Sequence, residues 1–289
     1  MSSRSTILVT GATGQQGGAL ARLLLAKGHH VRALTRKADS PAARELRSRG
    51  AELALGDFDD RASLERAMQG VDAVYLMATP FGAGIDGEVR QGKTAADVAT
   101  DAGVRHLVYS SVSDADRQTG IPHFDSKYAI EQHIRGLGIP YTVVAPASFM
   151  ENLDLQGVAE GRLALPLPAS RTLQQAAVAD IAGFAALVLE RREPFLGKRL
   201  DIASDELTGR EMAEILSRLT RHTVEYVQVP VETVRAQSED LALMFEWFDR
   251  VGYSADIPAL RRAYPDVGWH SFEAWAGAHA SKLLGTDVL

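Results

Sequence analysis

The sequence predicts an α/β fold in which a Rossmann-like, doubly wound parallel sheet is joined to a smaller C-terminal α/β lobe. Over about the first 150 residues, short apolar runs of strand length alternate with segments of helical periodicity. Such alternation is typical of βαβ units and a parallel sheet. The first apolar run also breaks into glycines at Gly11, Gly14 and Gly17 before a helical pattern begins, as in a dinucleotide-binding turn.

The first half of the chain supplies the elements of the main domain, expected over residues 1–150. Apolar runs bounded by turn residues predict strands at 7–10, 29–35, 51–55, 72–77, 106–110 and 141–145. Apolar residues at helical spacing predict helices at 16–27, 41–49, 60–68, 86–102 and 123–137. Ligands of such sheets bind beyond the carboxyl ends of the strands. That rule directs attention to Ala78, Thr79 and Pro80, which follow the fourth strand.

The second half, residues 151–289, predicts a smaller substrate lobe because prolines interrupt its pattern into short elements. A segment near 174–190 is expected to return to the Rossmann domain, with a helix at 180–190. The remaining expected elements are a strand at 198–202, a helix at 209–219, a strand at 224–229 and an aromatic helix at 240–251.

Composition excludes several classes of protein. The chain has 289 residues, 46% of them hydrophobic, a net charge of −6 and no cysteine. The acidic balance argues against a general affinity for nucleic acid or anionic membranes. No apolar run approaches the roughly 18 residues that span a bilayer, and the first residues lack the apolar core of a signal peptide. We therefore expect a cytoplasmic protein without nucleic-acid or membrane partners.

The motifs of other chemistries are missing from the sequence. Its eight histidines form no His-x-His or His-Glu-x-x-His pair, so no metal site is expected. There is no Gly-x-Ser-x-Gly elbow of a serine hydrolase. The glycine turn also lacks the Gly-Lys-Ser/Thr ending of a P-loop, which argues against phosphoryl transfer.

The glycine turn predicts a site for a nucleotide pyrophosphate. Its glycines allow a tight turn and close approach of the backbone to the anion, and the following helix points its N-terminal amides at it. A plain β-turn-α connection is the alternative. The residues assigned to cofactor binding here are Gly11, Ala12, Thr13, Gly14, Gln15, Gln16 and Gly17.

The end of the second strand favours NADP(H) over NAD(H). NAD-selective sites place an acid there, whereas a basic residue suits a 2′-phosphate. Arg36 and Lys37 stand at this point, and no acid appears before Asp39. A guanidinium can hold a phosphate with paired hydrogen bonds. A solvated basic turn remains the alternative.

An acidic cluster follows the third strand. Asp57, next to Phe58, could accept a hydrogen bond from the adenine amino group, whereas Asp59 or Asp60 is better explained as a helix cap. Capping explains the cluster as a whole equally well.

Candidates for acid–base chemistry lie on the helix at 123–137. Short-chain dehydrogenases use a Tyr-x-x-x-Lys pair there, and this chain has none. His123 and Lys127 are one turn apart on the same face. Either could donate a proton, and Lys127 could hold the nicotinamide ribose. The alternatives are a helix-start residue for His123 and a surface position for Lys127.

Five motifs together resemble the NmrA-like family of atypical short-chain dehydrogenases: Thr10 to Gly17, Gly56 to Asp60, Gln91 to Lys93, His123 to Lys127 and Phe149 to Asn152. The likeness covers nearly the whole chain. It implies a Rossmann domain with a small C-terminal lobe, in a family that holds NADPH-dependent quinone oxidoreductases, a triphenylmethane dye reductase and catalytically silent NADP(H) sensors. It further implies that the turn binds pyrophosphate, Arg36 the 2′-phosphate, and Asp57 and Phe58 the adenine side. The residues that it places at the nicotinamide half are Lys93, Lys127, Phe149, Met150, Glu151 and Asn152.

Two functions follow as hypotheses. The first is an NADPH-dependent reductase of a quinone or another flat, conjugated, apolar acceptor; the second is a non-catalytic NADP(H) sensor that acts through a protein partner. The absence of the tyrosine of a Tyr-x-x-x-Lys pair favours the sensor, and the presence of a full C-terminal lobe favours the enzyme. The glycine-rich loop 80–87 is expected to act as a lid, and a homodimer is allowed but not fixed by the sequence. The apolar side chains expected around the acceptor are Phe81, Phe149, Met150, Trp247 and Phe248.

Overall fold

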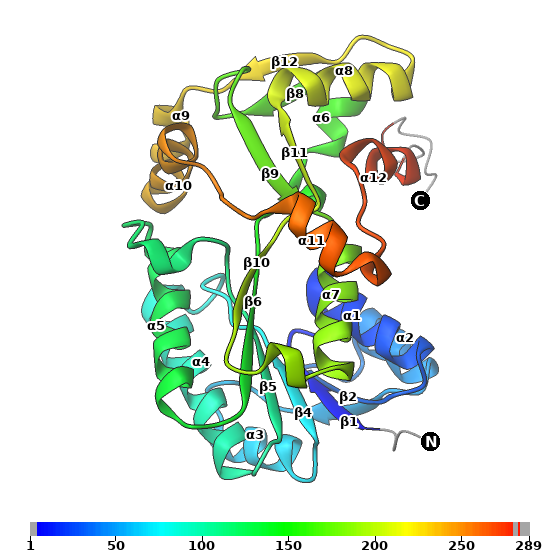
Figure 1. The fold of residues 1–289 in the computed structure, drawn as a ribbon, viewed down its shortest axis with the longest axis vertical. Coiled ribbons are helices and arrows are strands. Elements are labelled where there is room, and N and C mark those ends of the chain that lie inside the picture. The colour runs from blue at the N-terminus through cyan, green and yellow to red at the C-terminus, as the bar shows by residue number, and fades with distance from the viewer. Residues whose placement is uncertain (1–4, 280–282, 284–289) are drawn as a thin grey trace. The chain divides into compact units, whose positions relative to one another are not determined.

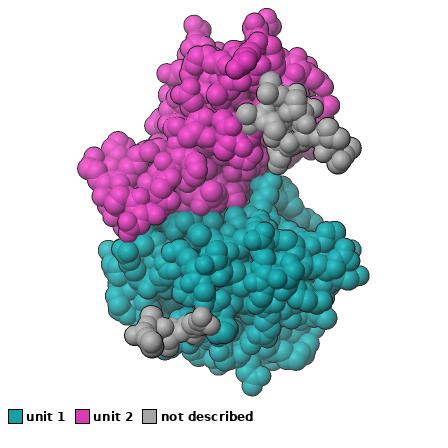
Figure 2. Space-filling model, turned by 90° about the vertical axis from the view of Figure 1, so that its right-hand side faces the viewer, with its two compact units in different colours: residues 1–118, 122–145, 181–200 teal, residues 119–121, 146–180, 201–289 magenta. Residues whose placement is uncertain are grey.

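The computed structural model describes residues 5–279 and 283, and its internal contacts divide the chain into two compact units (Figure 2). Unit 1 comprises residues 1–118, 122–145 and 181–200, and unit 2 comprises 119–121, 146–180 and 201–289. The chain first enters unit 2 briefly at Thr119. Its first long segment in unit 2 begins at Pro146, a few residues before the expected boundary at 150. Its return to unit 1 covers 181–200, later than the expected 174–190.

Unit 1 is built on a seven-stranded sheet with the order β10-β6-β5-β4-β1-β2-β3 (Figure 1). The neighbouring pairs among β1 to β6 are parallel. The doubly wound parallel sheet is thus confirmed. Its strands are β1 (Thr6–Val9), β2 (His30–Thr35), β3 (Glu52–Leu55), β4 (Ala73–Leu76), β5 (His106–Ser110), β6 (Tyr141–Pro146) and β10 (Arg199–Ile202).

Helices cover both faces of this sheet (Figure 1), with α3, α4 and α5 on one face and α1, α2 and α7 on the other. Apolar residues of the sheet and of α3 to α5 form one buried cluster. At Gly92 of α4, a Cβ would lie 2.5 Å from Ile130 Cδ1 of α5, so the close approach of these two helices needs glycine there. The helices and short 3-10 turns are α1 (Gln15–Ala26), α2 (Pro41–Ser48), α3 (Arg61–Met68), α4 (Gly84–Asp101), η1 (Ala115–Arg117), α5 (Pro122–Gly136), α7 (Val178–Glu190) and η3 (Glu193–Phe195).

The loop after β4 is shorter than the sequence suggested. The amide of Gly84 donates to the Pro80 carbonyl at 2.8 Å, and helix α4 begins at Gly84. The prediction of a loop over 80–87 is therefore wrong for its second half. Asp86 lies in the first turn of α4, where a carboxylate is favourable next to the helix N-terminus.

Unit 2 contains two small sheets and several short helices. One sheet has the order β11-β9-β7 and the other pairs β12 with β8 in parallel. Most of these strands and four of the helices escaped prediction because each has only a few residues, too short for a periodic pattern. The elements are β7 (Ser148–Phe149), η2 (Met150–Asn152), α6 (Leu155–Ala159), β8 (Arg162–Leu165), β9 (Thr172–Ala176), β11 (Asp205–Thr208), α8 (Gly209–Thr220), β12 (Glu225–Gln228), α9 (Val231–Arg235), α10 (Glu239–Arg250), α11 (Ile257–Ala263), η4 (Pro265–Val267) and α12 (Phe272–Ala278). Across the described part of the chain, no helix combines the length and apolar character needed to cross a bilayer.

Candidate functional site

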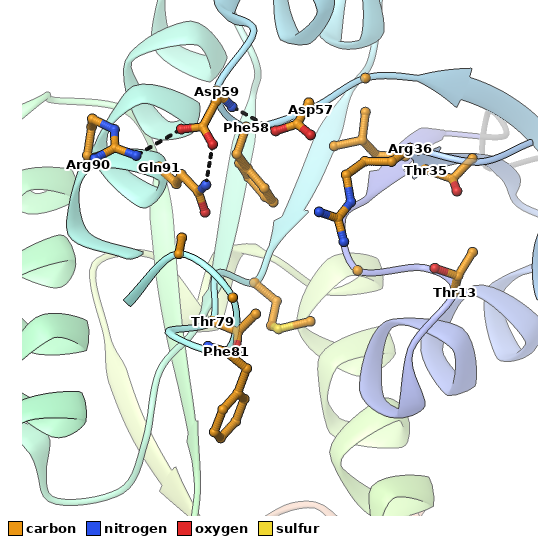
Figure 3. Close-up of a pocket in the computed structure, with 16 residues that line it drawn as sticks. Thr13, Thr35, Arg36, Asp57, Phe58, Asp59, Thr79, Phe81, Arg90 and Gln91 are labelled. Carbon is orange, nitrogen blue, oxygen red and sulfur yellow. Dashed lines mark hydrogen bonds and ion pairs between the residues drawn. The ribbon is translucent and has the colours of Figure 1, made fainter. Parts of the chain in front are cut away.

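A cavity of about 420 Å³ opens in unit 1 beyond the carboxyl ends of β1, β2, β3 and β4 (Figure 3). This edge of a doubly wound sheet is where such folds bind ligands. The sequence-predicted site residues that line the cavity are Gly11, Thr13, Arg36, Asp57, Phe58 and Thr79. The structure thus brings together residues that lie nearly 70 positions apart in the chain.

The glycine turn has the geometry of an anion cradle. Gly11 adopts φ +60°, which favours glycine, and Gly14 N donates to its carbonyl at 2.9 Å. A Cβ at Gly17 would lie 2.5 Å from the Gly11 carbonyl oxygen, so only glycine lets α1 start this close to the turn. Gly14 caps α1 without a side-chain hydrogen bond, so no capping side chain satisfies the amides of the first turn, and they are available to an anion.

The residues of the turn divide into exposed and buried ones. Thr13, Gly14 and Gln15 are exposed, whereas Ala12 and Gln16 are buried. The Gln16 side chain exchanges hydrogen bonds with the hydroxyl of Ser110, donating from Nε2 at 2.9 Å and accepting at Oε1 at 3.1 Å. The Gln16 side chain therefore joins α1 to β5, and its backbone amide is the group that remains for a ligand.

Arg36 supplies a cation to the cavity. Its exposed side chain projects from the end of β2 into the cavity between Phe58 and Thr13 (Figure 3). No carboxylate pairs with Arg36 among residues 5–279 and 283. Lys37 does not line the cavity. Its backbone amide donates to the Thr35 hydroxyl at 3.1 Å. The geometry therefore singles out Arg36 from the basic pair as the group able to hold a phosphate.

The acidic cluster after β3 has three separate roles. Asp60 caps α3, as expected for one member of the cluster. Asp59 instead accepts from Arg90 at 3.0 Å and from Gln91 at 2.8 Å, both on α4 (Figure 3). The hydrogen bonds from Arg90 and then Gln91 hold the pKa of Asp59 below its usual value. Asp57 accepts from the Asp59 amide at 3.0 Å through Oδ1, which leaves its second oxygen for a ligand in the cavity.

Lys127 is tied to a carboxylate that the sequence analysis missed. Its Nζ donates to Glu88 Oε1 at 2.7 Å and to the Ala78 carbonyl at 3.0 Å, and its side chain is 14% exposed. Glu88 is fully buried and also accepts from Ser126 Oγ at 2.5 Å. The alternative of a surface lysine is therefore wrong.

A signal for Glu88 was present in the sequence. Glu88 lies on the same helical stripe as the small buried residues Gly92, Ala95 and Ala99 of α4. An acid that continues a stripe of small residues along a helix is in position to be buried by whatever packs on that face. The pattern does not say which element packs on that face; in the structure it is α5.

His123 lies in the first turn of α5, the helix that also carries Lys127. It is half-buried, its ring packs edge-on against Phe124 with centroids 4.8 Å apart, and its carbonyl oxygen lies 3.1 Å from Ser126 Oγ. These contacts are those of a residue at a helix start, and a proton-donating role for His123 stays a prediction. In the part of the chain that the structure describes, no three His, Asp or Glu side chains gather as metal ligands.

Lys127 itself does not line this cavity, and neither do the other residues assigned to the nicotinamide half. Lys93 is half-buried on α4, whereas Phe149 to Asn152 belong to unit 2. Met150 is fully buried in the apolar core of unit 2. Glu151 accepts the Val178 amide at 3.0 Å and the Trp275 indole N–H at 3.0 Å. The carboxylate of Glu151 is thus engaged within unit 2.

The aromatic helix α10 contributes mainly to the packing of unit 2. Trp247 and Phe248 are 6% and 1% exposed, and their ring centroids are 5.8 Å apart. Both rings also contact Tyr253. The expectation that these two residues line an acceptor pocket is therefore not supported by their burial. Of the five apolar residues proposed for that pocket, Phe81 lines the unit 1 cavity and is 85% exposed.

Comparison with known proteins places these features in a family. The model of the NmrA-like family matches residues 3–283. A (4-alkanoyl-5-oxo-2,5-dihydrofuran-3-yl)methyl phosphate reductase of Streptomyces griseus is 32% identical over 235 residues, 79% of this chain and 79% of the relative. An NAD(P)H azoreductase of Xenophilus azovorans is 29% identical over 232 residues, again 79% of each chain.

Solved structures agree on the fold. The negative transcriptional regulator NmrA, in complex with NADP, superposes with a TM-score of 0.82 at 23% identity, covering 99% of this chain and 98% of NmrA. An NADPH-dependent quinone oxidoreductase of Escherichia coli, complexed with NADPH, has a TM-score of 0.71 at 23% identity over 96% of this chain and 94% of its own. From the match to the family model over almost its whole length, the chain belongs to the NmrA-like family.

Proposed function

We propose that this protein is an NADP(H)-dependent oxidoreductase that reduces a quinone or another flat, conjugated, apolar acceptor. The observation that carries the proposal is Arg36, a cation without a carboxylate partner in the described residues, which points into a cavity that Gly11 and Thr13 of the glycine turn also line. An acid at this position would select NAD(H), whereas a free guanidinium suits a 2′-phosphate.

The residues present fit the cofactor group by group. The cradle from Gly11 to Gly17 would hold the pyrophosphate, and Arg36 the 2′-phosphate. The free carboxyl oxygen of Asp57 would accept from the adenine amino group beside Phe58. Lys127 would donate to an oxygen on the nicotinamide side. Bound NADPH would supply the hydride, and the chain would supply binding and orientation.

Phe81 supports an apolar acceptor. It is one of the few large hydrophobic side chains that are strongly exposed, and it stands at the cavity on the segment after β4. Its phenyl ring points away from Arg36 (Figure 3), toward the side left over for an acceptor when a nucleotide lies along the strand ends. A planar conjugated molecule would gain contact area by stacking on such a ring. Relatives named as an azoreductase and a quinone oxidoreductase agree with this substrate class.

A non-catalytic NADP(H) sensor is the second candidate. The absence of a Tyr-x-x-x-Lys pair favours it, as does the shared fold of a transcriptional regulator in complex with NADP. In this case Arg36 and the cradle keep their roles, and the output is a change of protein partner or assembly.

Steady-state oxidation of NADPH with a panel of quinones, azo dyes and conjugated enones separates the two candidates. The reductase should oxidise NADPH with at least one acceptor class and do so more efficiently than NADH. The Phe81→Leu variant tests the stacking contact: it should keep the turnover of small acceptors and raise the KM of planar ones. Tight NADPH binding without oxidation by any acceptor, together with a cofactor-dependent change in assembly, would establish the sensor instead.

A further inference from the structure

The ion pair between Lys127 and Glu88 is unusual because both partners are withdrawn from solvent. Glu88 is fully buried and Lys127 is 14% exposed. Burying a carboxylate is unfavourable unless a cation and hydrogen bonds compensate it. Glu88 has both, in the ammonium of Lys127 at 2.7 Å and the hydroxyl of Ser126 at 2.5 Å. These two groups that compensate Glu88 belong to Ser126 and Lys127, which are consecutive residues of α5.

This pair reaches the edge of the cavity through Ala78. The Lys127 ammonium donates to the Ala78 carbonyl at 3.0 Å, and Ala78 lies between two cavity-lining residues, Met77 and Thr79. The helix that carries Glu88 also lines the cavity through Arg90 and Gln91. The Lys127 ammonium therefore lies next to the edge of the proposed cofactor site, at the segment that follows β4.

An ammonium group has three N–H donors. Glu88 Oε1 and the Ala78 carbonyl take two of them, and within residues 5–279 and 283 no further acceptor takes the third. With two donors fixed by a buried carboxylate and a backbone carbonyl, the direction of the third is fixed as well. A lysine side chain is flexible and loses rotamer entropy when it is held in one conformation. Here the contacts with Glu88 and Ala78 already hold it before a ligand binds.

We propose that Glu88 is a positioning residue: together with the Ala78 carbonyl, it orients the Lys127 ammonium so that its third N–H donates to a neutral oxygen of the bound ligand. This inference rests on the proposed function. The oxygen belongs either to a hydroxyl of the nicotinamide ribose or to the carbonyl of the acceptor, and both are served by the same donor geometry.

Calorimetric titration of Glu88→Gln with two ligands tests the proposal. One ligand is NADPH; the other is adenosine 2′,5′-bisphosphate, which keeps the phosphate contacts of Arg36 but lacks the nicotinamide ribose. Since hydrogen bonds to charged groups are strong, we expect NADPH affinity to fall about tenfold or more. Affinity for the bisphosphate should change less than about twofold, because Arg36 does not depend on Glu88.

The matched control is Asp97→Asn. Asp97 is also an acid of α4 that pairs with a residue of α5, His133, at 2.6 Å, but it is partly exposed and does not line the cavity. The same chemical change there should leave both affinities unaltered. If the substitutions only loosened the packing of α4 on α5, the affinities for both ligands would fall in both variants.

The remaining outcomes are each decisive. Unchanged NADPH affinity with a raised KM for the acceptor supports the proposal with the acceptor carbonyl as the oxygen. Unchanged NADPH affinity and unchanged acceptor KM in a folded Glu88→Gln protein overturns it. If that variant fails to fold, Glu88→Asp, which retains the charge but withdraws it by one methylene, is judged by the same two measurements.

A ligand-free measurement separates this inference from the proposed function. Reductive methylation of the Lys127 amine, followed by mass spectrometry of its peptide, should be slow in the unliganded protein and several-fold faster in Glu88→Gln. If Glu88→Gln is labelled faster but the unsubstituted protein binds neither ligand, the orienting contact stands and the cofactor assignment is rejected. Equal labelling rates would reject the orienting contact itself.

Discussion

Two of the buried carboxylates of unit 1, those of Glu88 and Glu131, have the same kinds of partner but differ in what those partners do. Glu88 and Glu131 are 0% and 1% exposed, and each faces one cation and one serine hydroxyl. For Glu131 the cation is Arg199, at 3.1 Å, and the hydroxyl is that of Ser111. Burial raises the pKa of Glu131, and the charge of Arg199 opposes this rise.

The two sites differ in what the cation does next. The guanidinium of Arg199 also donates to the Val112 carbonyl at 2.7 Å and lies 3.5 Å from Asp116. It therefore fastens β10 to the segment after β5. Lys127 instead retains one N–H beside the cavity wall. A buried acid can thus serve as a structural clamp or as a support for a ligand contact, and the donors left on its cation distinguish the two.

The largest expected effect comes from removing each cation in turn. Lys127→Met and Arg199→Met leave a buried carboxylate without its partner, which lowers the free energy of unfolding by about 3–5 kcal/mol. Adding Glu88→Gln to the first variant, or Glu131→Gln to the second, should recover most of the loss. Urea unfolding at neutral pH measures it. Double variants no more stable than the single ones would show that the uncompensated charge is not the cause.

A third buried ionisable group, His106, lets us test burial without ion pairing. Thr142 Oγ1 donates to the Phe195 carbonyl at 2.9 Å, so it accepts from His106 Nε2 at 2.9 Å. This contact assigns the neutral tautomer with the proton on Nε2. Burial, assisted by the nearby charge of Arg192, lowers the pKa of His106 to about 4.

The sign of the resulting pH dependence follows from linkage. Because the pKa of His106 is lower in the folded than in the unfolded protein, the unfolded state binds the proton first as pH falls. The stability contribution is complete above about pH 6.5 and is lost progressively toward pH 4, up to about 3 kcal/mol. His106→Gln keeps a donor to Thr142 but does not titrate, so its unfolding free energy should fall less between pH 6.5 and 4. Parallel curves for the two proteins over that range would contradict this assignment.

The smallest effect on stability is expected at Arg36, because it is exposed and its removal leaves no buried charge unpaired among the described residues. Arg36→Ala should leave the urea midpoint unchanged, since exposed substitutions rarely matter. It should weaken NADPH binding by roughly 1.5–3 kcal/mol, the loss of a charge-assisted contact to phosphate. NADH binding should stay nearly the same. Calorimetry decides, and a wild-type protein that binds NADH as tightly as NADPH would refute the cofactor preference.

Local sequence pattern was sufficient for the features that depend on near neighbours. The glycine turn could be predicted because Gly11 has a positive φ and Gly17 has no room for a Cβ. The parallel sheet could be predicted because strand and helix periods alternate along unit 1. Arg36 could be assigned to the cavity because a βαβ unit always places the end of its second strand beside the first turn.

Packing between distant segments settled everything else about the site. The stripe of small residues on α4 indicates that Glu88 faces a packing partner, but only the folded chain brings Lys127 to it from 39 positions away. The family resemblance assigns Glu151 to the nicotinamide half, and only the folded chain shows that its carboxylate accepts from the Val178 amide and the Trp275 indole. Which cation pairs with a buried acid, and which donors that cation has left, depends on contacts between elements that no local pattern encodes.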